Sequence, residues 1–324
     1  MSALPAVSEL ATRMGTAAAD WLGVLRADQL DRAQYPFDDP QRREWFYTPN
    51  IQAGLTLADM TATQQRATHR LVANALSDRG YAVLAAVMGL ENLIDAEEGW
   101  TGSYSGLPPD SRRRDPQLYF LAVFGDPAGP VWGWRFGGHH VSINYTIVEG
   151  RIAAGPIFLG ARPAVTVTGA NSTLRPLANE ADLAEQLVRS LDADQRADAI
   201  VAPEAPADIL QTNRASVPTG RWTPPGLAAK AMTDPQRAVL SGLVRQYAER
   251  LPAALAEDVL ARVADPASAE AYFAWAGDPA DQAHYYRVQA DRLLIEYDNV
   301  QDGANHAHSV WRDPTLDFGG DLLR

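Results

Sequence analysis

The sequence contains no cysteine and only one lysine, Lys230. The lack of cysteine excludes disulfides, thiolate metal ligands, iron–sulfur clusters and a cysteine nucleophile. Because the single lysine lies in the plain stretch GLAAKAM, the phosphate-binding pattern G-x-x-x-x-G-K-[ST] is absent, and a lysine Schiff base has little support. The patterns G-x-G-x-x-G and G-x-S-x-G are missing too, which disfavours a dinucleotide-binding fold and the usual hydrolase nucleophile.

An excess of basic residues is also missing. The chain has 28 Lys and Arg against 40 Asp and Glu, a formal net charge of −12 and a pI near 4.9. Nucleic acids and anionic membranes bind basic surfaces, so neither is an expected partner. No apolar run reaches bilayer-spanning length, and the first residues do not form a signal-peptide pattern. We expect a cytoplasmic protein that acts on a small molecule, and the sequence leaves its oligomeric state open.

The apolar content is high enough for a large core, because 46% of the 324 residues are hydrophobic. We expect a single large α+β domain, with a helical region over 1–100, a sheet core over 115–165 and 283–313, and a helical excursion over 179–266. Alternating apolar residues separated by turn residues predict four consecutive antiparallel strands in the first sheet segment and a hairpin in the second. The predicted sheet is mainly antiparallel, open or barrel-like, and covered by helices.

Two adjacent histidines, His139 and His140, lie within a strand pattern that follows the alternating aromatics of VWGWRF. By the two-residue period of a strand, His140 falls on the polar face with Ser142 and Asn144, and His139 falls on the apolar face. Both imidazoles can reach one metal ion only if the preceding glycine pair bends the chain. The alternative is that the two histidines form hydrogen bonds across strands.

A second histidine pair, His306 and His308, forms an H-x-H near the other end of the chain. On an extended strand these two side chains point to the same face, so both imidazoles can meet one ion without backbone distortion. Four of the six histidines lie in these two distant segments. The sequence therefore predicts a metal site with the ligands His139, His140, His306 and His308, and a structural role for these histidines is the alternative.

Three further residues are candidates for catalysis: Glu91, Glu296 and Arg312. Glu91 interrupts the apolar run AVLAAVMGLENLI, so it either reaches the surface or is buried with a cationic partner as a ligand or base. Glu296 shares one strand face with Asp298, although Asp298 could equally lie in a solvated turn. Arg312 could bind a substrate carboxylate or pair with the next residue, an aspartate. The amides and carboxylate expected to support the metal ligands are Asn144, Asp298, Gln301 and Asn305.

Several long motifs resemble a bacterial family of unknown function, DUF3500. They are WGWRFGGHHVSINYT, GPIFLGARPA, FAWAGD, HYYRVQ, LIEYDNVQDGANHAHSVWRDP and DFGGDLL, in this order along most of the chain. The resemblance implies shared polar positions but no activity, since the family name records none. These positions are His139, His140, Asn144, Glu296, Asp298, Asn299, Gln301, Asn305, His306, His308, Arg312 and Asp313. In place of the glycine-rich stretch expected near Arg175, this chain has NSTLRPLANE.

The leading hypothesis is a metal-dependent oxidoreductase, because several imidazoles with an open position suit oxygen chemistry at iron or copper. The alternative is a zinc-dependent hydrolase in which His140, His306 and His308 hold the metal and Glu91 or Glu296 deprotonates its water. A third hypothesis is a non-catalytic protein that binds a metal or a small ligand. If the histidines bind no metal, an arginine such as Arg135, Arg162 or Arg312 could still bind a small acid.

Overall fold

The computed structural model describes residues 5–101, 112–262 and 270–324, and the chain divides into two compact units. Unit 1 comprises Met1–Leu159, Asn213–Ala215 and Leu316–Arg324. Unit 2 comprises Gly160–Thr212 and Ser216–Thr315. Each unit combines helices with its own strands.

The helices of unit 1 follow the apolar periodicity of the first hundred residues. They are α1 (Pro5–Gly23), α2 (Ala27–Ala33), α3 (Ala62–Ala75) and α4 (Asp78–Glu97). Thr61 and Gln64 form a capping box that begins α3, and the side chain of Ser77 accepts a hydrogen bond that begins α4. The sequence Asp78-Arg79-Gly80 predicts a break between two helices, and the break is confirmed, because α3 ends at Ala75 and Ser77 begins α4.

The strands of unit 1 form a ladder with one parallel pair. They are β1 (Gln34–Tyr35), β2 (Leu55–Thr56), β3 (Tyr119–Gly125), β4 (Val131–Gly138), β5 (Val141–Val148) and β6 (Arg151–Ala161), with short 3-10 turns η1 (Pro40–Arg43), η2 (Leu57–Asp59) and η4 (Asp317–Leu323). The order is β1-β3-β4-β5-β6, β2 also pairs with β3, and only β1 runs parallel to its neighbour. The predicted four-strand meander is thus confirmed as β3 to β6.

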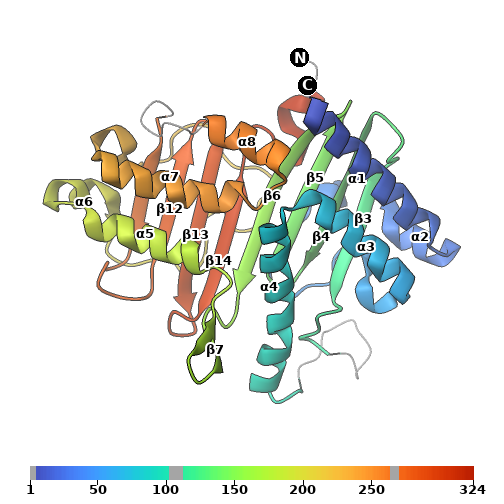
Figure 1. Ribbon diagram of the computed structural model, residues 1–324, viewed down its shortest axis with the longest axis horizontal. Coiled ribbons are helices and arrows are strands. Elements are labelled where there is room, and N and C mark those ends of the chain that lie inside the picture. Colours follow the sequence, from blue (N-terminus) through green and yellow to red (C-terminus); the bar gives the residue numbers. More distant parts are fainter. Residues whose placement is uncertain (1–4, 102–111, 263–269) are drawn as a thin grey trace. The chain divides into compact units, whose positions relative to one another are not determined.

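The two faces of this ladder differ in character. On one face Trp134 stacks on Tyr145 with ring centroids 5.2 Å apart, and the Tyr145 hydroxyl donates to the carbonyl of Ala75 in α3. Figure 1 shows α1, α3 and α4 along this side of unit 1. On the other face the buried Arg135 guanidinium donates to the carbonyls of Gln41 (2.7 Å) and Ala53 (3.0 Å). Helices therefore cover the aromatic face, and irregular chain covers the polar one.

Unit 2 begins with a short hairpin, and two helices follow it. Its helices are α5 (Ala178–Ser190), α6 (Ala193–Ala199), η3 (Ala229–Ala231), α7 (Asp234–Ala248) and α8 (Ala253–Arg262), and β7 (Thr166–Gly169) pairs with β8 (Ser172–Leu174). The sequence Thr233-Asp234-Pro235 predicts a helix start and Pro252 predicts a break between two helices, and both are confirmed by α7 and α8. The sequence also predicts that Asn179 caps a helix across Asp182 to Leu191. This prediction is wrong, because α5 already starts at Ala178 and the Asn179 side-chain amide donates to Gln246.

The strands of unit 2 form a second ladder. They are β9 (Ile200–Ala202), β10 (Leu227–Ala228), β11 (Tyr272–Ala276), β12 (Tyr285–Ala290), β13 (Leu293–Gln301) and β14 (His306–Arg312). The order is β10-β11-β12-β13-β14, and β9 lies parallel to β11. On the helix-covered face, Tyr286 donates to the carbonyl of Glu180 in α5, and its hydroxyl lies 2.6 Å from that of Tyr247 in α7. Figure 1 shows α5 and α7 running across these strands.

The other face of this ladder is covered by the proline-rich segment 203–226. Its main chain bonds to polar side chains of the strands: the Leu210 amide to Glu296 (2.8 Å), the Trp222 amide to Gln289 (3.1 Å) and the Pro224 carbonyl to Arg287 (2.6 Å). The structure confirms the α+β class and the mainly antiparallel pairing. Across the described residues each strand order has two distinct ends, so neither ladder closes into a barrel. No described helix is both long and apolar enough to cross a bilayer.

Candidate metal centre

The face of β13 and β14 beneath segment 203–226 carries acidic and imidazole side chains. Glu296 and Asp298 are two residues apart on β13 and therefore share this face. Asp298 is paired with His308 across the antiparallel β13–β14 ladder, so their side chains project to the same side. Strand periodicity and register together bring a carboxylate and an imidazole into contact.

Asp208 completes a cluster with Asp298 and His308. The Nδ1 atom of His308 lies 2.9 Å from Oδ1 of Asp208 and 3.4 Å from Oδ2 of Asp298. One ligand atom from each of the three residues lies within 4.8 Å of the others, a separation at which one ion could bind all three. The Asp208 side chain is 32% exposed, whereas the other two are buried. Two side chains of the cluster, Asp298 and His308, are therefore buried, and the third, Asp208, is accessible to solvent.

Hydrogen bonds on both sides hold Asp208 in place. The amide of Gln301 donates to the carbonyl of Ala207 (3.2 Å), and the backbone amide of Leu210 donates to Glu296 (2.8 Å). Gln301, predicted as a residue that supports the metal ligands, therefore anchors the chain beside Asp208. The sequence prediction missed Asp208, because a single aspartate in a proline-rich segment follows no ligand spacing.

The cluster has an excess of acidic groups. Both carboxylate oxygens of Asp298 are buried and have no hydrogen-bond partner among the described residues. Burial raises the pKa of Asp298, and the neighbouring His308 opposes this shift. Burial alone would lower the pKa of His308, but the hydrogen bond with Asp208 and the negative charges of Asp208 and Asp298 outweigh it and raise the pKa to about 9. Two carboxylates around one imidazole favour a positive charge at this position.

Glu296 adds a third carboxylate on the same face. Its Oε1 atom accepts hydrogen bonds from the hydroxyl of Tyr285 and the amide of Leu210, both at 2.8 Å. Its Oε2 atom is buried without a hydrogen-bond partner among the described residues. Burial raises the pKa of Glu296, and the hydrogen bond from Tyr285 opposes that shift. Glu296 can therefore accept a proton at its free oxygen.

The H-x-H pair lies on the extended strand that the sequence predicts. The ring centroids of His306 and His308 are 4.7 Å apart, and the Nδ1 atom of His306 is 3.2 Å from Asp302. Asp302 also pairs with Arg162 at 2.7 Å. The side chain of Asn305 accepts from the amide of Val165 (2.8 Å), so it anchors the chain that follows β6. Arg312 is buried on β14, two strand repeats beyond His308 on the same face.

In unit 1 the histidine pair does not lie on a strand, so that sequence prediction is wrong. The strand β4 continues through both glycines, and His139 and His140 form the two-residue turn that leads into β5. A Cβ atom on Gly138 would lie 2.6 Å from the ring of Tyr119, so the glycine permits close packing and does not mark a bulge. His140 has φ +61, and its amide donates to the carbonyl of Tyr47 (2.8 Å).

The turn places His139 against Glu91. The Nδ1 atom of His139 is 2.5 Å from Oε1 of Glu91, and both side chains are buried. Burial raises the pKa of Glu91 to about 8, and the positive charge of Arg114 opposes the shift. Arg114 also lies 3.4 Å from the His139 ring and pairs with Glu98 at 2.8 Å. The carboxylate in the apolar helix α4 is therefore buried with a partner, one of the two alternatives that the sequence left open.

Asn144 has a structural position in unit 1. Its amide donates to the hydroxyl of Ser142 (3.0 Å) and to the carbonyl of Pro156 (2.8 Å), which ties β5 to β6. Its Oδ1 atom is buried without a hydrogen-bond partner among the residues that the structure describes.

Comparison with protein families gives one match. The family model described as "Protein of unknown function (DUF3500)" matches residues 8–320 of the 324. The chain belongs to the DUF3500 family. The resemblance noted from the sequence motifs is thus confirmed, and the family description assigns no activity. No curated protein and no solved structure matches this DUF3500 chain.

The two histidine pairs of the DUF3500 chain belong to different compact units, His139 and His140 to unit 1, and His306 and His308 to unit 2. A centre shared by all four stays a prediction from the sequence. Within unit 2, His308 shares its cluster with two carboxylates. Within unit 1, His139 and Glu91 form a separate dyad, and the rings of His139 and His140 stack with centroids 3.8 Å apart.

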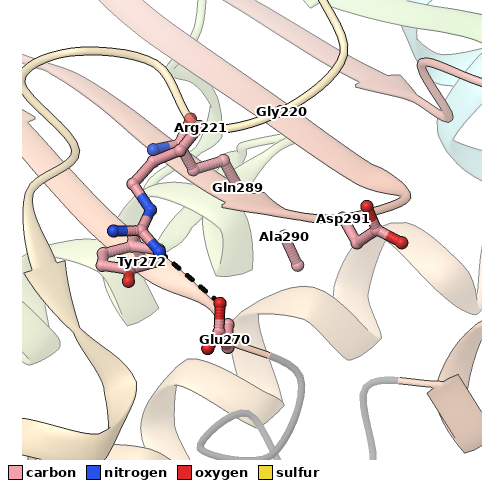
Figure 2. A pocket seen from close by; sticks show the side chains of 7 residues that line it. All are labelled: Gly220, Arg221, Glu270, Tyr272, Gln289, Ala290 and Asp291. Atoms are coloured by element: carbon pink, nitrogen blue, oxygen red, sulfur yellow. Dashed lines mark hydrogen bonds and ion pairs between the residues drawn. The ribbon is translucent and has the colours of Figure 1, made fainter.

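Unit 2 of the DUF3500 chain also has a pocket of about 430 Å³ away from the cluster (Figure 2). Arg221 lies over the ring of Tyr272 at 4.4 Å and pairs with Glu270 at 3.5 Å. Asp291, at the turn between β12 and β13, lines the other side of the pocket. Asp298 lies five residues beyond the start of β13 at Leu293, roughly 17 Å along the strand, and Asp291 precedes that start. The pocket and the acidic cluster are therefore separate features of unit 2.

Proposed function

We propose that this DUF3500 protein is a metal-dependent enzyme whose ion is bound in unit 2 by Asp208, Asp298 and His308. The observation that supports this most is the convergence of three ligand atoms within 4.8 Å, one of them on a buried carboxylate without a hydrogen bond. A buried carboxylate is strongly unfavourable unless a cation compensates it, and without a metal ion the protonated His308, 3.4 Å away, would have to do so. A divalent ion would balance the charge of both aspartates and leave His308 neutral as a ligand.

The donor set narrows the choice of metal. Two carboxylates, one imidazole and no thiolate suit zinc, manganese or ferrous iron better than copper. Three protein ligands leave coordination positions for water and substrate, as in catalytic rather than structural zinc sites. The Asp208 side chain is 32% exposed, so an ion from solvent can reach this ligand.

Hydrolysis of a small molecule is the reaction that these groups support best. A bound metal ion would lower the pKa of a coordinated water. Glu296 would accept the proton from this water at its free Oε2 atom, and Tyr285 would hold the carboxylate through Oε1. The water oxygen would bond to the electrophilic centre of the substrate, and the proton would pass to the leaving group. Buried Arg312, on the same face, would orient an acidic substrate.

A second candidate is oxidoreductase chemistry at iron, which the position of His306 favours. Its ring lies 4.7 Å from that of His308, so release from Asp302 would allow a site of two imidazoles and one carboxylate. That ligand set is typical of non-haem iron oxygenases. A non-catalytic metal-binding protein is the remaining alternative, and it would have a full coordination sphere without exchangeable water.

Metal analysis of the full chain, purified without a histidine tag, tests the proposal. We expect one equivalent of zinc, manganese or iron in the wild type and its loss in Asp208→Asn and Asp298→Asn. Glu91→Gln is the matched control, because Glu91 is also a buried carboxylate beside a histidine but lies outside the cluster. Wild-type protein without metal after incubation with these ions, or full metal in Asp298→Asn, would contradict the proposal. Iron together with oxygen-dependent turnover would favour the oxidoreductase over the hydrolase.

A further inference from the structure

The two units repeat the same order of helices and strands. In unit 1 the order is α1, α2, β1, β2, α3, α4 and then β3 to β6. In unit 2 the additional β7–β8 hairpin comes first, and the order is then α5, α6, β9, β10, α7, α8 and β11 to β14. The strand pairing repeats as well. β1 and β9 run parallel to β3 and β11, β2 and β10 run antiparallel to the same strands, and four antiparallel strands follow in sequence order.

The helix caps repeat in detail. Gln29 begins α2 with a capping box, donates to the carbonyl of Asp59 (2.8 Å) and bonds to Gln64, the capping residue of α3. Gln195 begins α6 with a capping box, donates to the carbonyl of Ala231 (2.9 Å) and bonds to Gln236, the capping residue of α7. The sequences ADQLDRA and ADQRADA hold the first glutamine of each set.

Two glycines occupy one geometrical position. Gly54 (φ +128) and Gly226 (φ +88) each precede the short strand that pairs with the first long strand of the unit. A Cβ atom would lie 2.8 Å from the carbonyl oxygen of Leu121 in the first case and 2.2 Å from that of Phe273 in the second. Both positions demand glycine for the same reason, a close approach of two backbones with positive φ.

Stacked aromatic pairs on the long strands show which residues of the two units correspond. Trp134 stacks on its cross-strand partner Tyr145 (5.2 Å, 9°), and Tyr286 stacks on its partner Tyr297 (5.1 Å, 10°). The next residue on the first strand of each pair is a buried arginine that donates to the irregular chain over the opposite face. A common ancestor accounts for matching order, caps, glycines and stacked pairs more simply than separate origins.

We infer that the chain is a tandem duplication of one α+β unit, and that only the second copy carries the metal ligands. When Tyr145 is aligned with Tyr297, the next residues, Thr146 and Asp298, are aligned as well. Their cross-strand partners are Ala153 for Thr146 and His308 for Asp298. Arg42 and Asp208 correspond too, since each lies eight residues beyond the start of β1 or β9. Unit 1 thus has arginine, threonine and alanine where unit 2 has aspartate, aspartate and histidine.

The contacts in unit 1 support this correspondence. The guanidinium of Arg42 lies 3.4 Å from the hydroxyl of Thr146 and donates to the carbonyl of Phe318 (2.8 Å). Arg42 therefore contacts the strand residue Thr146 in unit 1, just as Asp208 contacts His308, the strand partner of Asp298, in unit 2. A guanidinium and a methyl group cannot bind a cation, so these matching positions offer a cation site in unit 2 and none in unit 1. The duplication rests on the fold alone, and the expected one ion per chain rests on the proposed function.

Transfer of the ligands to unit 1 tests the inference. In the full chain, Arg42→Asp, Thr146→Asp and Ala153→His together place the three ligand types at the matching positions. Equilibrium dialysis against Zn²⁺, followed by elemental analysis, should give two ions per chain where the wild type binds one. A cooperatively folding variant that still binds one ion would overturn the correspondence. If the wild type binds no ion, the proposed function fails, and the duplication is judged by the converse exchange.

The converse exchange places the residues of unit 1 into unit 2. Asp298→Thr with His308→Ala should give a cooperatively folding chain that binds no ion, because the equivalent framework already accommodates this pair. Circular dichroism and urea unfolding would measure the folding, and the same dialysis would measure the metal. Loss of cooperative unfolding in this variant would overturn the inference, whatever the metal content of the wild type. This arm also decides the question if the three-residue variant fails to fold.

Discussion

Asp298 lies opposite His308 across the β13–β14 pair, and its two carboxylate oxygens are buried without a hydrogen bond among the described residues. Such a group destabilises a folded protein unless something binds it, and the nearest imidazole is 3.4 Å away. Asp208 comes from a segment about ninety residues earlier, and two hydrogen bonds hold that segment against β13. This convergence makes a cation site the simplest account of the cluster.

Metal binding should stabilise the folded chain. For a ligand that binds only the native state, a free concentration a hundred times Kd adds about 2.7 kcal/mol to the free energy of unfolding. We expect a rise of this order for the wild type when Zn²⁺ or Mn²⁺ replaces EDTA in urea unfolding. Asp298→Asn should unfold at the same urea concentration with and without metal. Equal metal stabilisation of the variant and the wild type would exclude Asp298 as a ligand.

His284 should make stability depend on pH. The residue is fully buried, its ring stacks on Trp275 at 4.4 Å, and burial lowers its pKa to about 4. In the unfolded chain the pKa returns to about 6.5, so between these values only the unfolded state takes up the proton. The stabilising effect is therefore full above pH 6.5 and is lost as pH falls toward 4, by at most about 3 kcal/mol.

Replacement of His284 by Phe isolates this effect, because the aromatic stack is kept and the titration is removed. The difference in unfolding free energy between variant and wild type should shift in favour of the variant as pH falls from 6.5 to 4. Urea unfolding in EDTA at several pH values measures it without interference from metal release. A constant difference over this range would show that His284 titrates normally in the folded protein.

The Glu91–His139 dyad predicts a contrast between two substitutions. Glu91→Gln keeps a group that can bond to His139, so its cost should stay near 1 kcal/mol. Glu91→Ala leaves a cavity and a buried imidazole without this partner, which should cost about 3 kcal/mol. Chemical denaturation at neutral pH would compare them, and equal costs would mean that the contact contributes little to stability.

Two glycines should respond oppositely to alanine. At Gly226 a Cβ atom would lie 2.2 Å from the carbonyl oxygen of Phe273 at positive φ, so Gly226→Ala should cost about 3 kcal/mol or more. Gly89 lies inside α4 with nothing within 4 Å of an added Cβ, so Gly89→Ala should stabilise by about 1 kcal/mol. Thermal unfolding of both variants checks the pair. A tolerated alanine at position 226 would contradict the close backbone approach.

The local patterns of the sequence were reliable where the physics is local. The two-residue alternation predicts β3 to β6, Thr233 and the residues after it predict the start of α7, and the H-x-H spacing predicts two imidazoles on one strand face. The repeated ADQ motif and the repeated M-T-x-x-Q of the helix caps were also readable, and they are the signal from which the duplication could have been found. Each depends on residues only a few positions apart.

The sequence by itself determined the α+β class, the meander β3 to β6, the hairpin β12–β13, the family, and the presence of histidines and carboxylates suited to a metal. Only the tertiary structure decided which of them meet. Asp208 joins the cluster because a proline-rich segment folds over β13, and His139 meets Glu91 because the histidine pair forms a tight turn toward α4. Both contacts join residues far apart in the chain, and register, side-chain packing and backbone hydrogen bonds fix them together.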